Sequence, residues 1–200
     1  MITIKGKRCE PEGFFMMLGT IILAAGKGTR MKSELPKVLH PVAGKPMIRQ
    51  VLDVVEQAEI GQCYIVLGHG AHEVKAALGE TDYEYPIQRP QLGTGHGVMQ
   101  AVPYIPIEMR GVLVVCGDTP LLRPETLAAL KQSFLDTNAA CTVLTTKLAN
   151  PTGYGRILRD EAGNITGIVE EKDATPEQKQ IQEVNTGTYF FDYRLLTEAL

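Results

Sequence analysis

Several features that would assign a protein to a special class are missing from this 200-residue sequence. No apolar run reaches the roughly 20 residues that a membrane-spanning helix needs. Positive charge is not in excess, with 20 Lys and Arg against 23 Asp and Glu, whereas proteins that bind the phosphate backbone of nucleic acids are usually basic. We therefore expect a protein that binds neither membranes nor nucleic acid.

Cysteine is scarce and scattered. The four residues, Cys9, Cys63, Cys116 and Cys141, form no CxxC pair of the kind that marks many zinc sites, and their spacing does not indicate a disulfide framework. We predict free, mostly buried thiols in a reducing compartment, which places the protein in the cytoplasm.

The chain does have the composition and length of one globular domain, with 44% hydrophobic and 22% charged residues. Apolar runs predict strands at 21–25, 63–67, 83–88, 111–116 and 141–147. Helical spacing predicts helices at 47–58, 71–78, 93–101 and 124–134. This alternation predicts an α/β fold: a Rossmann-like mixed, mostly parallel sheet flanked by helices.

The pattern changes after residue 147. Residues 157–159 and 165–170 predict a hairpin, residues 186–191 one more strand, and residues 193–200 a helix. At the other end, we expect residues 1–17 to form a loose extension before a single domain over 18–200.

Residues 21–37 carry the most informative pattern, an apolar run followed by a cationic loop. Gly26 and Gly28 let the backbone approach an anion closely, and Arg30 and neighbouring lysines supply positive charge. The loop is not a Walker A motif, because no Gly-Lys-Ser/Thr follows a four-residue gap. Arg30 also occupies the position of the third glycine in a dinucleotide fingerprint. The loop therefore predicts a phosphate site of another kind.

Polar residues follow the predicted strands at several further points. They lie at 93–94, 117–118, 170–172 and 185. Ligands of open α/β sheets bind outside the carboxyl ends of the strands. We therefore predict a single site assembled from several strand ends.

Seven segments along the chain form a recognisable set. They are LAAGKGTRM (23–31), LPKVLHPVAGKPM (35–47), QLGTGHG (91–97), CGDTPLL (116–122), PTGYGRI (151–157), GIVEEKDAT (167–175) and EVNTGTY (183–189). Together they resemble the sugar-phosphate nucleotidyltransferases, and most specifically the uridyltransferase domains of the bifunctional bacterial enzymes that make UDP-N-acetylglucosamine. The resemblance covers residues 18–200. The first segment indicates only the superfamily, whereas the later ones are more specific.

This resemblance implies that the protein condenses UTP with N-acetylglucosamine 1-phosphate, giving UDP-N-acetylglucosamine and pyrophosphate with Mg²⁺ as cofactor. The product would serve the synthesis of cell-wall precursors for peptidoglycan and lipopolysaccharide. The phosphate oxygen of the sugar would attack the α-phosphorus directly, so that positioning and electrostatics carry the catalysis. The resemblance also implies a monomeric fragment, whereas full-length relatives would form homotrimers.

Site roles follow from the same resemblance. The residues implied to hold UTP are Leu23, Ala24, Ala25, Gly26, Gly28, Thr29, Gln88, Gly93 and Thr94. Arg30 and Lys37 would act on the reacting phosphates, with the planar fork of Arg30 suited to pyrophosphate. Gly117 is implied to take part in substrate binding, and Asp118, directly after it, would bind Mg²⁺. The residues implied to hold the sugar phosphate are Gly155, Glu170, Lys172 and Asn185.

The chain also departs from the family. It has Cys116 where the family usually has Tyr, and no counterpart of a second Mg²⁺ ligand, an Asn that the family places beyond residue 200. The acetyltransferase β-helix is absent too, so we expect a truncated domain with no acetyltransferase activity and an incomplete metal site. Two alternatives stay open: a thymidylyl- or other sugar-phosphate or molybdopterin nucleotidyltransferase, and a nucleotide-sugar-binding module with little turnover.

Overall fold

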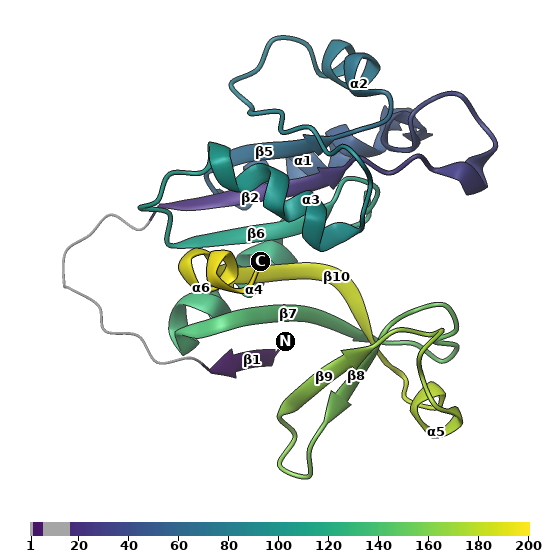
Figure 1. Cartoon of the computed structure of the whole chain (residues 1–200), viewed down its shortest axis with the longest axis vertical. Helices are drawn as coiled ribbons and strands as arrows, with labels where there is room; N and C mark the ends of the chain where they lie inside the picture. Colours follow the sequence, from purple (N-terminus) through teal and green to yellow (C-terminus); the bar gives the residue numbers. More distant parts are fainter. Residues whose placement is uncertain (1, 6–16) are drawn as a thin grey trace.

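The computed structural model describes residues 2–5 and 17–200, with side chains from residue 17 onward except at position 30. The predictions for Cys9 and for most of the N-terminal extension lie outside these residues. A single twisted sheet organises the described chain, in the strand order β1-β7-β10-β6-β2-β5 (Figure 1). The strands along this order are β1 (Ile2–Lys5), β2 (Leu18–Ala24), β5 (Gln62–Leu67), β6 (Gly111–Cys116), β7 (Ala139–Lys147) and β10 (Glu183–Asp192).

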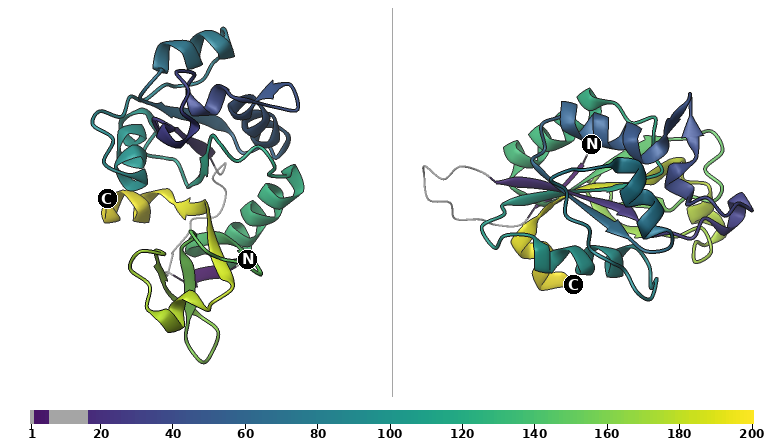
Figure 2. Two further views of the ribbon diagram at one scale, coloured as in Figure 1. Left: turned by 90° about the vertical axis from the view of Figure 1, so that its right-hand side faces the viewer. Right: turned by 90° about the horizontal axis from the view of Figure 1, so that it is seen from above.

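Helices cover both faces of the sheet, as the right-hand view of Figure 2 shows from above. One face packs against α1 (Met47–Gln57) and α4 (Pro124–Thr137), and the other against α3 (Thr94–Ala101) and α6 (Tyr193–Ala199). Successive residues of β2 serve the two cores in turn: Ile22 packs with the first pair of helices and Ile21 with the second, and both are fully buried. This arrangement explains why β2 reads as a continuous apolar run rather than an alternating one.

The strands β5, β2 and β6 form the parallel part of the sheet. Ile22 of β2 lies between Ile65 of β5 and Val115 of β6. The prediction of a mixed α/β sheet is confirmed, but "mostly parallel" overstates it, because β10 lies antiparallel between β6 and β7. Strand–helix alternation gives the direction of β7 correctly and does not reveal that a later strand separates it from β6.

Two further sequence predictions need correction. Residues 2–5, expected in a loose extension, form β1 and pair antiparallel with β7. Residues 83–88 form no continuous strand: Glu84 and Ile87 make isolated parallel bridges to β5. Pro86 interrupts the segment because it has no N–H to donate.

The four helices predicted within residues 47–134 are all present, and α2 (Ala71–Leu78) has the predicted bounds. The predicted hairpin is present as β8 (Arg156–Arg159) and β9 (Ile165–Val169), which project from β10 through the pairing of Arg156 with Val184 (Figure 1). A small hairpin, β3 (Pro41–Val42) with β4 (Lys45–Pro46), precedes α1. The short helix α5 (Pro176–Lys179) was not predicted, although Thr175 and Gln178 form a capping box at its N-terminus, a pattern that indicates the start of a helix.

Three 3₁₀ turns lie within residues 17–200. They are η1 (Thr29–Met31), η2 (Lys37–Leu39) and η3 (Val102–Tyr104). The first two follow β2 directly and carry the cationic loop and Lys37 to the carboxyl edge of the sheet. No helix among the described residues is long and apolar enough to cross a membrane.

Candidate active site

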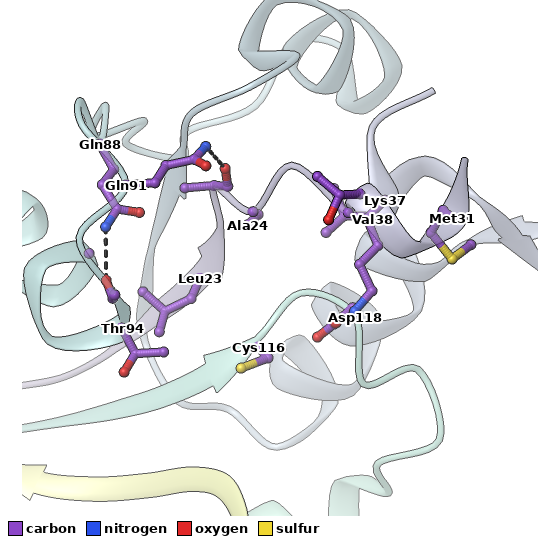
Figure 3. A pocket seen from close by; sticks show the side chains of 16 residues that line it. Leu23, Ala24, Met31, Lys37, Val38, Gln88, Gln91, Thr94, Cys116 and Asp118 are labelled. Carbon is purple, nitrogen blue, oxygen red and sulfur yellow. Dashed lines mark hydrogen bonds and ion pairs between the residues drawn. The ribbon is translucent and has the colours of Figure 1, made fainter. Parts of the chain in front are cut away.

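A cavity of about 750 Å³ opens at the carboxyl ends of β2 and β6 (Figure 3). We call it the strand-end cavity. Eleven of the residues predicted for the site line it: Leu23, Ala24, Ala25, Gly26, Gly28, Thr29, Lys37, Gln88, Gly93, Thr94 and Asp118. Segments more than 90 positions apart in the chain therefore converge on one cavity, as the rule for open α/β sheets requires.

Two independent constraints require glycine at position 28. Its φ of 59° lies in the left-handed region, which favours glycine. A Cβ placed on it would also lie 2.7 Å from Cβ of Lys37, far inside normal contact distance. The absence of a side chain at position 28 therefore lets the glycine loop fold directly against the segment that carries Lys37.

Lys37 and Asp118 form an ion pair on one side of the cavity, where Figure 3 shows their side chains pointing toward each other. Lys37 begins η2, and Asp118 follows β6. The side chains are 32% and 26% exposed, so both charged groups face the cavity rather than the core. The pair places one positive and one negative group beside the glycine loop.

Gly117, which the resemblance assigns to substrate binding, is not among the residues that line the cavity. Its N–H donates to the carbonyl of Leu23 (2.9 Å), and a Cβ here would lie 3.3 Å from the side chains of Ala24 and Val38. Gly117 thus allows close packing beneath the cavity and positions Asp118.

The opposite side of the cavity carries Gln88, which is only 6% exposed. Its amide nitrogen donates to the carbonyl of Gly93 (2.8 Å) and lies 3.1 Å from Nδ1 of His96. Its backbone N–H donates to Leu67 of β5 (2.8 Å). The position of Gln88 is thus fixed by the segment that we predict to read the base.

Gln91 was missed by the sequence analysis, although the QLGTGHG segment contains it. Its side-chain amide donates to the carbonyl of Ala25, joining this segment to the glycine loop (Figure 3). The cavity is also lined by Met31, Val38, Gly97 and Cys116. Burial raises the pKa of the Cys116 thiol to about 11, an effect that Asp118 strengthens and Lys37 opposes, so this thiol is protonated near neutral pH and is a poor nucleophile.

Three residues of the predicted sugar set lie together where β8, β9 and β10 meet. The backbone N–H of Asn185 donates to the carbonyl of Gly155 (2.8 Å), and a Cβ on Gly155 would lie 3.2 Å from Oε1 of Glu170. Lys172 is not brought to this cluster: its side chain is 83% exposed and lies 3.9 Å from Asp173. Its sequence position within the charged turn did not reveal that it faces outward.

Tyr189 is a further residue that sequence reasoning missed. The side-chain amide nitrogen of Asn185 donates to the Tyr189 hydroxyl (2.6 Å), and its side-chain oxygen, Oδ1, accepts from the backbone N–H of Gly187 (3.0 Å). A Cβ on Gly187 would lie 3.9 Å from the sulfur of Cys116, which lines the strand-end cavity. Gly187 thus places the sugar set next to the cavity floor. Burial raises the pKa of Tyr189, so its hydroxyl keeps its proton.

A second cavity of about 720 Å³ adjoins the first, and Gln88 and Gln91 line both. His69 and His72 line this second cavity. In the part of the chain that the structure describes, no three His, Cys, Asp or Glu side chains gather into a metal-binding cluster. Asp118 offers the strand-end cavity one carboxylate, a donor that would suit a metal ion taking most of its other ligands from phosphates and water.

Comparison with known proteins finds close relatives. The chain is 55% identical over 180 residues to the Bifunctional protein GlmU of Exiguobacterium sibiricum, covering 90% of this chain and 40% of that protein. The protein of the same name from Enterococcus faecalis is 54% identical over 180 residues, covering 90% and 39%. The chain thus spans about two fifths of the length of these relatives.

Solved structures give the fold independently. A UDP-glucose pyrophosphorylase complexed with UDP-glucose matches with a TM-score of 0.77 at 19% identity, covering 91% of this chain and 78% of that one. At this identity the match supports the fold, a mixed sheet flanked by helices.

A family model, the MobA-like NTP transferase domain, matches residues 20–181. This match spans the glycine loop, the ion pair and Glu170, so the chain belongs to the MobA-like NTP transferase domain family.

Proposed function

We propose that this chain is a Mg²⁺-dependent uridyltransferase that condenses UTP with N-acetylglucosamine 1-phosphate, releasing pyrophosphate and UDP-N-acetylglucosamine. One observation carries the proposal: the strand-end cavity brings the glycine loop, Lys37, Asp118 and the Gln88–Thr94 segment to one place. The 55% identity to proteins named Bifunctional protein GlmU supports this choice of substrates within the family.

The two sides of the cavity suit the two ends of UTP. Gln88 and Gly93 form the side suited to uracil: the amide nitrogen of Gln88 is held by the Gly93 carbonyl, and its amide oxygen can accept from the base edge. Gly28 and Thr29 form the phosphate side, where open backbone and nearby cations favour anions. Arg30 follows them and, on the sequence motif, would hold the leaving pyrophosphate.

The acceptor would lie between the cavity floor at Cys116 and the cluster of Gly155, Glu170 and Asn185. The Glu170 carboxylate can accept from sugar hydroxyls. The backbone around Gly155 can approach the acetamido group because no side chain intervenes. Lys172 keeps no role in this proposal, because its side chain faces outward.

Lys37 would perform the main electrostatic work on the reacting phosphates. Two anions must meet, and a fixed ammonium group offsets their repulsion in the transition state. The nucleophile is already an ionised phosphate, so no general base is required. Asp118 would hold Mg²⁺ with water and phosphate oxygens as its other ligands; when bound, the ion would neutralise charge that develops on the phosphates.

Cellular context follows from the same proposal. A product of this kind would enter the synthesis of cell-wall precursors. The free thiols at Cys63, Cys116 and Cys141 suit a reducing compartment such as the cytoplasm. We propose a monomer for this chain and a homotrimer for the longer proteins that contain such a domain.

Pyrophosphate release separates the candidate functions. Release from UTP, N-acetylglucosamine 1-phosphate and Mg²⁺ that exceeds release from dTTP and glucose 1-phosphate supports the uridyltransferase. The reverse preference would support a thymidylyltransferase. No release with either pair, together with tight calorimetric binding of UDP-N-acetylglucosamine, would identify a binding module.

A further inference from the structure

Arg156 is a buried cation that the proposed reaction has not used. Its side chain is 1% exposed, and its backbone lies at the junction of three strands, paired with Val169 of β9 and Val184 of β10. A buried guanidinium is strongly unfavourable unless a carboxylate and hydrogen-bond acceptors satisfy it. The side chain of Arg156 therefore needs specific partners.

Those partners come from the turns on either side of the sugar cluster. Nη2 of Arg156 lies 2.7 Å from Oε2 of Glu171, and its guanidinium also donates to the carbonyls of Tyr154 and Lys179. The same Glu171 oxygen accepts the backbone N–H of Gly153 (3.2 Å). The Glu171 carboxylate thus binds the loop at 151–155 through the backbone of Gly153, and the first residue of β8 through the side chain of Arg156.

Each of the two connected segments carries one residue of the sugar cluster. Gly155 ends the loop at 151–155, and Glu170 begins the turn at 170–173, which is closed by the N–H of Asp173 on the carbonyl of Glu170 (2.9 Å). Gly155 and Glu170 nearly touch, because a Cβ on the glycine would lie 3.2 Å from the carboxylate. The relative position of these two residues depends on how the two segments are joined.

We propose that Glu171 and Arg156 are positioning residues for the sugar-phosphate acceptor. Their ion pair holds the loop at 151–155 against the turn at 170–173, so that Gly155 and Glu170 together form one wall of the acceptor subsite. The inference rests on the proposed function for the identity of the acceptor. It rests on the contacts alone for the coupling of the two segments.

Kinetics on Glu171 variants test the positioning role. Glu171 is the better target, because it is 32% exposed and its loss disturbs the core less than loss of Arg156. Glu171→Ala should raise KM for N-acetylglucosamine 1-phosphate about tenfold, because the wall loses its fixed geometry. KM for UTP and kcat at saturating acceptor should stay within twofold of the parent chain. Glu171→Gln, which keeps an acceptor oxygen but loses the charge, should fall between the parent chain and Glu171→Ala.

Arg159→Gln is the matched control. It removes a second Arg–Glu pair of the same length, Arg159 with Glu183 at 2.7 Å, from the other end of β8. KM for the acceptor should stay at the parental value in this variant. An unchanged acceptor KM in Glu171→Ala, an equal rise in both KM values, or the same acceptor effect in Arg159→Gln would overturn the positioning role.

Hydrogen exchange distinguishes failure of this inference from failure of the proposed function. Glu171→Ala should accelerate amide exchange in peptides covering 151–155, where Gly153 loses its acceptor, and Arg159→Gln should not. Unchanged exchange in Glu171→Ala would overturn the coupling itself, whatever the activity. A parent chain that shows this coupling but releases no pyrophosphate would contradict the proposed function alone.

Discussion

Lys37 and Asp118, 81 positions apart in the chain, form an ion pair on one side of the strand-end cavity. Each group lies beside the place where the proposed reaction needs its charge. In this arrangement they neutralise each other. A bound nucleotide and metal ion would instead offer Lys37 a phosphate and Asp118 a cation, so the proposed function implies that the two residues exchange partners when substrate binds.

The first prediction concerns Asp118. Asp118→Asn keeps the shape of the side chain but removes the charge that would hold Mg²⁺. Loss of one well-placed electrostatic group costs about 3 kcal/mol of barrier, so kcat should fall more than 100-fold. Pyrophosphate release at saturating Mg²⁺ measures this effect. Asp136→Asn on the exposed side of α4 is the control, and a parental rate in Asp118→Asn would exclude Asp118 as the metal ligand.

The second prediction concerns Gly28. Gly28→Ala should cost about 1–2 kcal/mol of stability through its left-handed backbone and, in addition, displace Lys37. A displacement of about 1 Å at the reacting groups lowers kcat/KM on the order of 100-fold. Gly163→Ala is a matched control, because Gly163 has a φ of 82° but a Cβ placed on it would meet nothing within 4 Å. Urea unfolding should show a stability loss in Gly28→Ala at least as large as that in Gly163→Ala, whereas an equal loss of activity in the two variants would contradict the role of the Gly28–Lys37 contact.

The third prediction concerns Gln88. Gln88→Leu removes the amide that fixes Gly93 and faces the base side of the cavity. Loss of a hydrogen bond to a buried partner costs about 1–3 kcal/mol, so KM for UTP should rise between about fivefold and 150-fold. KM for the sugar phosphate should stay near its parental value. Gln132→Leu on α4 provides a control for the change in polarity, and an unchanged KM for UTP in Gln88→Leu would remove Gln88 from the base site.

The fourth prediction concerns stability at high pH. Burial raises the pKa of Cys63 to about 12, from an ordinary value of 9.0. The folded state therefore keeps this proton while the unfolded chain loses it, so the contribution to stability is complete below about pH 9 and is lost as the pH rises toward 12. Urea midpoints measured between pH 8 and pH 11 should fall with pH. The fall of the midpoint with pH should be shallower in Cys63→Ala, and an identical fall in that variant would contradict the contribution of the Cys63 thiol.

Local sequence signals account for much of the fold. The apolar run of β2 and the amphipathic spacing of α1 were both readable, because burial on one or two faces of an element leaves a direct pattern. The position of β10 between β6 and β7 could not be predicted from the sequence. It depends on pairings such as Tyr189 with Val114 and Val143, which join distant parts of the chain and leave no periodic signal.

The site divides in the same way. The glycine loop and Asp118 could be predicted because each follows an apolar strand, where the fold places ligands. The contact of Tyr189 with Asn185 could not be predicted, because both residues belong to β10, whose sequence indicates a strand and gives no sign of a site. The outward position of the Lys172 side chain could not be predicted from its motif, because the geometry of the turn after β9 decides which of three consecutive charged residues faces inward.

One competition experiment tests the central claim most directly. Equal concentrations of UTP and dTTP are incubated with N-acetylglucosamine 1-phosphate, Mg²⁺ and this chain, and the nucleotide sugars are separated by chromatography. The proposed function predicts UDP-N-acetylglucosamine as the main product, in equal amount to the pyrophosphate released. A dominant thymidine product, or no nucleotide sugar from a chain that binds UTP, would contradict it.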